Sequence, residues 1–264
     1  MSCVKLVYFS PTGTTKAVVQ RIGSGINPTA VELIDITLPE VRKQPLDLSE
    51  DDVLVIGVPV YMGRVPALLS DWLNSIEAHD TPAVCVVVYG NRVYDNSLLE
   101  LKESVVRRGC IPIAGAAYIG EHSFSEETVP TAHGRPDIED LRHAEAFGQR
   151  IREKLQSVSS LSQLPDLVVP GEHPYGGATE LWDVDFIAVS HQCEQCGACA
   201  AVCPVGAIDS QDSALIDQVK CITCCACIKK CPQKARSMKP GPVKDAQKRL
   251  GSLCQEQKKP ECFL

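Results

Sequence analysis

The chain has 264 residues, of which 44% are hydrophobic and 22% charged, so it can form a sizeable core and is neither disordered nor fibrous. Residues 1–185 hold 15 Lys and Arg and 26 Asp and Glu, a net charge of −11, which argues against a nucleic-acid partner. Residues 186–264 hold 11 Lys and Arg and 7 Asp and Glu, a net charge of +4. We expect a cytoplasmic location and no membrane insertion, because the N-terminus does not resemble an export signal and no apolar stretch is long enough to cross a bilayer.

The first half alternates short apolar runs with segments of helical periodicity, as in a parallel sheet covered by helices on both faces. Five strands are predicted, at residues 6–9, 31–36, 53–58, 84–89 and 111–118. Helices are predicted at residues 14–26, 67–76, 96–108 and 136–155. The pattern indicates an α/β fold with a doubly wound, five-stranded parallel sheet over residues 1–156.

Three further parts follow this domain. Residues 157–185 are rich in Ser, Pro and Gly and predict a linker. Residues 186–240 form a small module that contains an internal repeat, and residues 241–264 form a tail in which 243–257 has the pattern of an amphipathic helix.

The internal repeat is the pattern Cys-x2-Cys-x2-Cys-x3-Cys-Pro, which begins at Cys193 and again at Cys221. Three thiolates at this spacing can hold three corners of a 4Fe-4S cluster, and the Cys before Pro ligates the other cluster in two-cluster proteins. Zinc is disfavoured, because zinc sites use separated pairs of ligands. The crossed rule predicts two ligand sets: Cys193, Cys196, Cys199 and Cys231 for one cluster, and Cys221, Cys224, Cys227 and Cys203 for the other.

The module resembles bacterial two-cluster ferredoxins, which implies two 4Fe-4S clusters and a small α+β fold. Cys225 stands where the first repeat has Gly197, and we interpret it as a small core residue, with a redox thiol or alternative ligand as the other reading. The positive charge of this part either offsets the negative clusters or helps the two halves to dock.

A polar loop, residues 10–15, connects the first strand to the first helix, where backbone N–H groups and the helix dipole favour an anion. Its sequence lacks the Gly-Lys-Ser/Thr of a P-loop and the repeated Gly of a dinucleotide loop. A turn with N-capping Thr residues is the other interpretation. Two more loops, residues 59–66 and 89–95, follow strands that end at the same sheet edge, so all three are expected to meet in one crevice.

These loops resemble the FMN-binding loops of flavodoxins. The resemblance implies that the phosphate is held by Ser10, Thr12, Gly13, Thr14 and Thr15. It also implies that the flavin ring is flanked by Pro59, Val60, Tyr61, Met62, Gly63, Arg64, Tyr89, Gly90, Asn91, Arg92 and Tyr94. Tyr61 and Tyr94 are candidates to stack on the ring, and each also has a plain core interpretation.

Other side chains near these loops have two interpretations each. Arg64 and Arg92 are candidates to stabilise an anionic flavin or bind a partner, and solvated charges are the alternative. His122, in a long polar loop after the fifth predicted strand, is a candidate proton donor, with a solvated loop histidine as the safer expectation.

The whole chain resembles fusions of a flavodoxin with a two-cluster ferredoxin from anaerobic bacteria and archaea. The resemblance implies an electron carrier that connects FMN, two clusters and redox partner proteins, and no catalytic residue is expected. Two alternatives stay open: a flavin-dependent reductase of a small substrate fed by its own clusters, and an iron-sulfur sensor or binding protein. The sequence is compatible with a homodimer and names neither donor nor acceptor.

Overall fold

The central sheet is mainly parallel in the computed structural model, which describes residues 3–177 and 184–264. Residues 178–183 of the predicted linker lie outside the described residues. The sheet has the order β10-β7-β6-β4-β1-β2. Its strands are β1 (Cys3–Tyr8), β2 (Val31–Asp35), β4 (Asp52–Pro59), β6 (Thr81–Tyr89), β7 (Cys110–Ile119) and β10 (Glu261–Phe263). The five parallel strands follow the doubly wound order 2-1-3-4-5, which confirms the predicted flavodoxin-like fold class.

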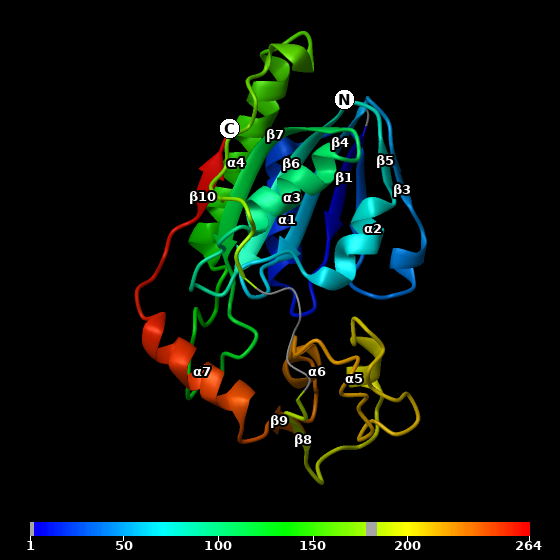
Figure 1. Ribbon diagram of the computed structural model, residues 1–264, viewed down its shortest axis with the longest axis vertical. Coiled ribbons are helices and arrows are strands. Elements are labelled where there is room, and N and C mark those ends of the chain that lie inside the picture. Colours follow the sequence, from blue (N-terminus) through cyan, green and yellow to red (C-terminus); the bar gives the residue numbers. More distant parts are fainter. Residues whose placement is uncertain (1–2, 178–183) are drawn as a thin grey trace.

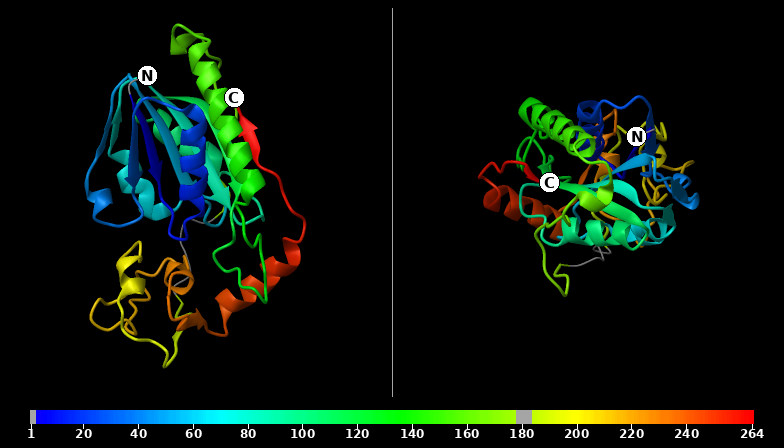
Figure 2. Two further views of the ribbon diagram at one scale, coloured as in Figure 1. Left: turned by 180° about the vertical axis from the view of Figure 1, so that it is seen from behind. Right: turned by 90° about the horizontal axis from the view of Figure 1, so that it is seen from above.

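Helices cover both faces of the sheet (Figures 1 and 2). On one face lie α1 (Thr14–Ile26) and α4 (Ile138–Gln156), and on the other lie α2 (Ser70–Asn74) and α3 (Ser97–Val106). Gly25 and Gly148 allow α1 and α4 to touch backbone to backbone, because a Cβ on Gly25 would lie 1.9 Å from the Glu145 carbonyl oxygen. The amphipathic pattern of each helix thus follows the layer that it covers.

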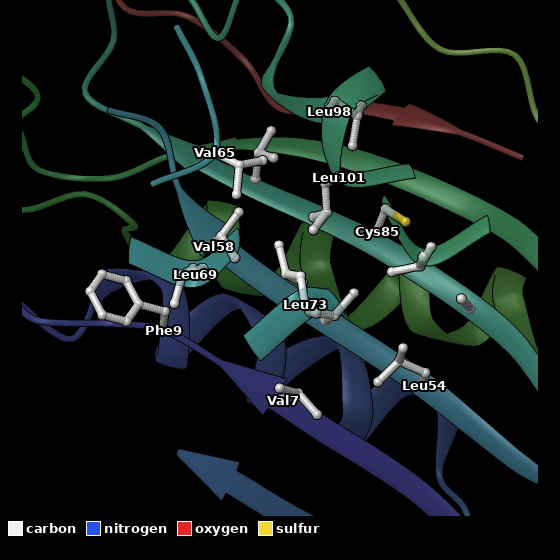
Figure 3. Close-up of a cluster of buried hydrophobic side chains, with 14 of the residues drawn as sticks. Val7, Phe9, Leu54, Val58, Val65, Leu69, Leu73, Cys85, Leu98 and Leu101 are labelled. Atoms are coloured by element: carbon white, nitrogen blue, oxygen red, sulfur yellow. The ribbon is translucent and has the colours of Figure 1, made fainter. Parts of the chain in front are cut away.

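Two buried clusters form the core, one on each face of the sheet. Figure 3 shows part of the cluster under α2 and α3, where Val7 and Leu54 from the sheet meet Leu73 and Leu101 from the helices. β4 and β6 are buried along nearly their whole length, as expected for strands covered on both faces. This burial explains why the sequence shows continuous apolar runs there.

Three details differ from the sequence prediction. The helix predicted at 67–76 is shorter: Ala67–Leu69 forms a 3-10 turn, α2 follows, and Ile76–Ala78 is a strand, β5, that pairs with β3 (Leu46–Leu48). The sheet has a sixth strand, β10, antiparallel to β7. The predicted linker contains a 3-10 turn at Leu161–Gln163 and buries Leu167 and Val169 in the core.

The cysteine repeat forms a small module with its own core. It contains β8 (Ile187–Val189), β9 (Arg236–Met238) and the short helices α5 (Ala198–Ala201) and α6 (Ala226–Lys229). β8 and β9 pair as antiparallel strands. The longer helix α7 (Pro242–Leu253) follows and leads to β10. Figure 1 shows this module beside the end of the sheet where the strands finish.

Polar contacts connect the module to loops at that end of the sheet. The Arg42 guanidinium donates to the Pro204 carbonyl oxygen at 2.6 Å, and Lys229 forms an ion pair with Glu121 at 2.5 Å. In α7, Lys244 forms an ion pair with Glu126 at 2.9 Å. The two ion pairs join cations of the positive part to carboxylates of the negative part, in keeping with the opposite net charges of the two parts.

Candidate functional site

The loop between β1 and α1 has the geometry of an anion cradle. Gly13 caps α1 with φ +98°, a conformation that glycine adopts without strain. The Ser10 hydroxyl accepts a hydrogen bond from the Lys16 N–H at 3.0 Å, and the Ser10 N–H donates to the Thr37 hydroxyl at 2.9 Å. These bonds fix the loop, and the hydroxyl hydrogen of Ser10 stays free to donate to an anion.

Space for an anion is present over this loop. The nearest atom to a Cβ placed on Gly13 is the Lys230 ammonium nitrogen, at 4.0 Å. Lys230 belongs to the cysteine module and was not among the residues that the sequence predicts for this site. The module therefore brings a positive charge to the mouth of the loop, and only the docking of the two parts reveals it.

A cavity of about 50 Å³ extends from this loop into the predicted crevice. It is lined by residues from all three predicted loops and from the loop after β7: Ser10, Pro11, Thr12, Thr14, Thr15, Pro59, Val60, Tyr61, Val88, Tyr89, Gly90, Gly120, Glu121, His122 and Ser123. One further lining residue is Cys224 of the module. The crevice is therefore closed on one side by a predicted cluster ligand.

A second cavity of about 350 Å³ adjoins the first and shares several of its walls, among them Tyr61, Tyr89 and His122. Met62, Gly63, Gly90, Arg92 and Val93 line it from the sheet edge. Ile222, Thr223, Ala246, Arg249 and Leu250 line it from the module and α7. A small polar cavity that opens into a larger, mainly apolar one suits a ligand with an anionic end and a flat aromatic end.

Tyr61 stands between the crevice and the cysteine module. Residues 61–64 form a tight turn in which Tyr61 and Arg64 exchange two backbone hydrogen bonds of 3.0 Å, with Met62 and Gly63 at positive φ. Burial raises the pKa of the Tyr61 hydroxyl, and nearby Cys224 and Cys225 raise it further. Tyr61 therefore faces the crevice on one side and the second cysteine triplet on the other.

Two residues predicted to contact the flavin form contacts inside the fold. Tyr94 is 8% exposed and lies in the core, where its ring packs 5.4 Å from the ring of Tyr89 and its hydroxyl donates to the Glu261 carboxylate at 2.9 Å. Arg64 binds the Glu100 carboxylate through two hydrogen bonds of 2.8 Å. Neither side chain lines the two cavities, because each is drawn into contacts inside the fold.

Asn91 is held by the C-terminal segment. Its side-chain amide donates to the carbonyl oxygens of Cys254 at 3.0 Å and Glu256 at 2.8 Å, and its amide oxygen accepts from the Lys258 N–H at 3.2 Å. Asn91 has φ 62°, which Asn tolerates better than most residues. The segment after α7 therefore fixes the loop after β6, and the Asn91 side chain is committed to it.

His122 is packed into the crevice wall. A Cβ on Gly90 would lie 2.2 Å from the His122 ring, so the ring rests on the Gly90 backbone. Nδ1 accepts from the Phe124 N–H at 3.0 Å, which leaves Nε2 to carry the proton of the neutral ring. Burial, together with the positive charges of Lys229 and Arg92, lowers the pKa of His122 to about 4. His122 is therefore a neutral donor in the wall of both cavities.

The second predicted ligand set surrounds one cavity of the module. Cys203, Cys221, Cys224 and Cys227 line it, together with apolar residues such as Ile208 and Ile216. The backbone N–H of Ala207 donates to the Cys203 sulfur at 3.2 Å. Thiols from both repeats thus meet at one place, where they would suit a cluster that accepts N–H donors at its sulfurs.

The first predicted set, Cys193, Cys196, Cys199 and Cys231, lies nearer the surface. Cys196 is exposed and Cys199 is buried, and the N–H of Ala235 donates to the Cys231 sulfur at 3.3 Å. Within residues 3–177 and 184–264, no three His, Cys, Asp or Glu side chains lie close enough together to hold a single metal ion. The thiolates around a four-iron cluster stand farther apart than the ligands of one ion.

Cys225 is buried and has φ 58°, where the first repeat has Gly197 at φ 73°. Its thiol lies 3.7 Å from the Thr223 carbonyl oxygen. Besides Cys225, five cysteines lie outside the two sets and form no disulfide with any residue that the structure describes: Cys3, Cys85, Cys110, Cys254 and Cys262. Burial raises the pKa of Cys85 and Cys110, so both are poor nucleophiles.

Comparison with known families identifies the module. Residues 186–232 match the model of the 4Fe-4S dicluster domain. Over 63 residues, the chain is 40% identical to a Proteus vulgaris protein described as a probable iron-sulfur subunit of the Frd operon. That match covers 24% of this chain and 40% of the length of the relative.

Among solved structures, the chain is similar to flavodoxins. It is 18% identical to a flavodoxin from the domain Archaea, with a TM-score of 0.41 over 59% of this chain and 99% of the other. A flavodoxin of Streptococcus pneumonia TIGR4 is 13% identical, with a TM-score of 0.41 over 58% and 99% of the two chains. Within the described residues, no helix is both long and apolar enough to span a membrane.

Proposed function

We propose that this chain, in which a flavodoxin-like α/β fold is joined to a 4Fe-4S dicluster domain, is an electron carrier that binds FMN and two 4Fe-4S clusters and serves redox partner proteins. The observation that carries the proposal is the position of Cys224, which lines the same cavity as the Ser10–Thr15 loop and Tyr61. Bound flavin exchanges one or two electrons, whereas each cluster exchanges one, so the pair can connect two kinds of redox partner.

In this proposal, Ser10, Thr12, Gly13, Thr14 and Thr15 bind the FMN phosphate. The donors available are backbone N–H groups at the start of α1 and the Ser10 hydroxyl, and the cradle over Gly13 has room for the anion. Lys230 supplies a counter-charge from the module. The phosphate therefore also bridges the two parts of the chain.

The flavin ring would occupy the larger cavity, beside Tyr61, Tyr89 and Gly90. Val60, Met62, Gly63 and Arg92 complete its wall on the sheet side, and Pro59 lines the smaller cavity next to it. The neutral His122 ring directs its Nε2 hydrogen away from the Phe124 N–H and is available to donate a hydrogen bond inside the crevice. Burial keeps this donor uncharged, so it binds without adding a full positive charge.

Each cluster takes thiolates from both repeats in the proposal. Cys221, Cys224, Cys227 and Cys203 would hold the cluster next to the crevice, and Cys193, Cys196, Cys199 and Cys231 the cluster farther away. Cys196 is exposed, which supports the cluster held by Cys193, Cys196, Cys199 and Cys231 as the one that exchanges electrons with a partner protein. Cys224, a ligand of the other cluster, lines the crevice. Electrons would then pass between the crevice and the surface through two sites in series.

The first experiment is cofactor analysis of protein purified without oxygen. About eight irons, eight sulfides and one FMN per chain are expected from two cubane sites and one flavin site. Zinc in place of iron, or a preparation that cannot be reconstituted with FMN, would remove the corresponding part of the proposal. Electron delivery from a low-potential donor to an acceptor protein then tests the carrier role.

A flavin-dependent reductase is the second candidate, favoured by the size of the 350 Å³ cavity and by the two cations, Arg92 and Arg249, in its wall. A small anionic substrate would be the expected class. Steady turnover of such a substrate without any acceptor protein would favour this candidate over the carrier, and turnover that requires the acceptor would reject it.

A further inference from the structure

Among the residues that the structure describes, Arg236 is a buried cation without a carboxylate partner. It lies in β9 and is 4% exposed. Its Nη2 donates to the Ser213 carbonyl oxygen, and its buried Nη1 has no hydrogen-bond partner within residues 3–177 and 184–264. In the part of the chain that the structure describes, Arg236 takes part in no ion pair.

This arrangement is unfavourable for the polypeptide alone. A guanidinium cannot lose its proton in a protein, so burial does not neutralise it as it neutralises a lysine. Buried charges are therefore normally paired, and a single carbonyl oxygen supplies only a dipole. An unpartnered Nη1 points to a negative group that the described residues do not provide.

Arg236 lies between the two cysteine triplets. β9, which carries Arg236, packs against α6, the helix that contains Cys227 of the second triplet. On its other side, the Ser213 that it binds donates its N–H to the Gln195 side chain at 2.7 Å. Gln195 stands between Cys193 and Cys196 of the first triplet.

The internal repeat shows that a cation is not required by the fold at this position. The two copies are offset by 28 residues, so Arg236 corresponds to Ile208, and the preceding residues, Ala235 and Ala207, are the same. Ile208 is also buried, at 7% exposure, and lines the cavity of the second ligand set. One copy of the module thus fills this position with an apolar side chain and the other with a charge.

We propose that Arg236 is the internal counter-charge of the dicluster module and raises the reduction potential of the cluster that it faces. The inference rests on the proposed presence of the clusters. Thiolate-ligated clusters are negative and gain one more negative charge on reduction, so a nearby cation stabilises the reduced form more than the oxidised form. Because Ile208 supplies no such charge, Arg236 also makes the two cluster environments unequal.

The test is a redox titration of both clusters, followed by electron paramagnetic resonance, in the wild type, Arg236→Gln and Arg236→Lys. The neutral Gln variant should lower the reduction potential of at least one cluster by about 59 mV, which corresponds to a tenfold change in the equilibrium constant of its one-electron reduction. The Lys variant should retain most of the wild-type value, since it keeps the charge. Equal shifts in both variants, or no shift in the Gln variant, would overturn the inference.

A second pair of variants keeps Arg236 in place, in case its replacement prevents cluster assembly. Val189 lies directly opposite Arg236 in the β8–β9 pair, where side chains are neighbours. Val189→Glu should pair with the guanidinium and lower the potential relative to the matched Val189→Gln, and equal potentials would count against the inference. Iron and sulfide analysis separates the two failures: wild-type protein without clusters refutes the proposed function, whereas intact clusters with unchanged potentials refute only the role of Arg236.

Discussion

Replacing Asn91 by Asp should release the C-terminal segment from the crevice. Asn91 is 3% exposed, and its amide nitrogen donates to the carbonyl oxygens of Cys254 and Glu256. Asp has almost the same shape and also tolerates positive φ, so the substitution leaves the backbone preference intact. It replaces the two-fold donor by an acceptor that faces two carbonyl oxygens.

The expected cost follows from the bonds that are lost. A hydrogen bond contributes about 0.5–1.5 kcal/mol net, and a buried acceptor that loses its donor costs about 1–3 kcal/mol. Because Glu256 is exposed, water can satisfy its carbonyl oxygen, and we expect a local loss of about 2–3 kcal/mol. Since 1.4 kcal/mol is a factor of ten, opening of the segment should become roughly 100-fold more frequent.

Hydrogen exchange measured by mass spectrometry on peptides that cover residues 254–263 can detect this change. Asn74→Asp on the exposed surface of α2 is the matched control, because it alters the net charge equally. FMN should also bind more weakly to Asn91→Asp, since Gly90 and Arg92 flank the altered residue. Exchange in residues 254–263 at the rate of the Asn74→Asp control would refute the reasoning.

Three further outcomes are expected. Gly90→Ala should weaken FMN binding in a fluorescence titration, because its Cβ would lie 2.2 Å from the His122 ring, whereas Gly176→Ala, with its nearest neighbour at 3.6 Å, should bind normally. The unfolding free energy should fall as the pH drops from 6.5 to about 4, by up to about 1.4 kcal/mol per pH unit. The reason is that His122 takes up a proton in this window when the protein is unfolded but not when it is folded. In thermal unfolding measured as a function of pH, His122→Asn should show a smaller loss of stability over this range. Cys225→Ser should keep about eight irons per chain, whereas the neighbouring Cys224→Ser should lose iron, and equal iron contents would contradict the ligand assignment.

Much of the fold could be predicted because its strands are buried on both faces. The Val- and Ile-rich runs of β4 and β6 leave little ambiguity, and α1 occupies the residues predicted for it. β10 was missed, because a three-residue strand at the sheet edge has no periodic pattern to detect. Leu167 and Val169 show the same limit, since their apolar side chains sit in a segment whose composition indicates a linker.

The site was harder to predict where side chains form hydrogen bonds with residues that are distant in the sequence. Tyr94 and Arg64 follow strands that end at the crevice, yet Glu261 and Glu100 hold them elsewhere. Sequence position alone cannot reveal these partners, because they come from other parts of the chain. Lys230, in contrast, lies at the site although the sequence did not predict it there, because only the docking of the module brings its ammonium group to the loop after β1.

The pairing of β10 with β7 makes the cysteine module an inserted element with two attachments. The chain leaves the flavodoxin-like part before β8 and returns to it through α7, and Figure 2 shows the returning strand on the outer edge of the sheet. A module on one flexible tether would swivel about it, and its distance from the crevice would vary with tether length. Two attachments restrict the module to a hinge motion about the line that joins them. This restriction favours a constant separation between the redox centres from one molecule to the next.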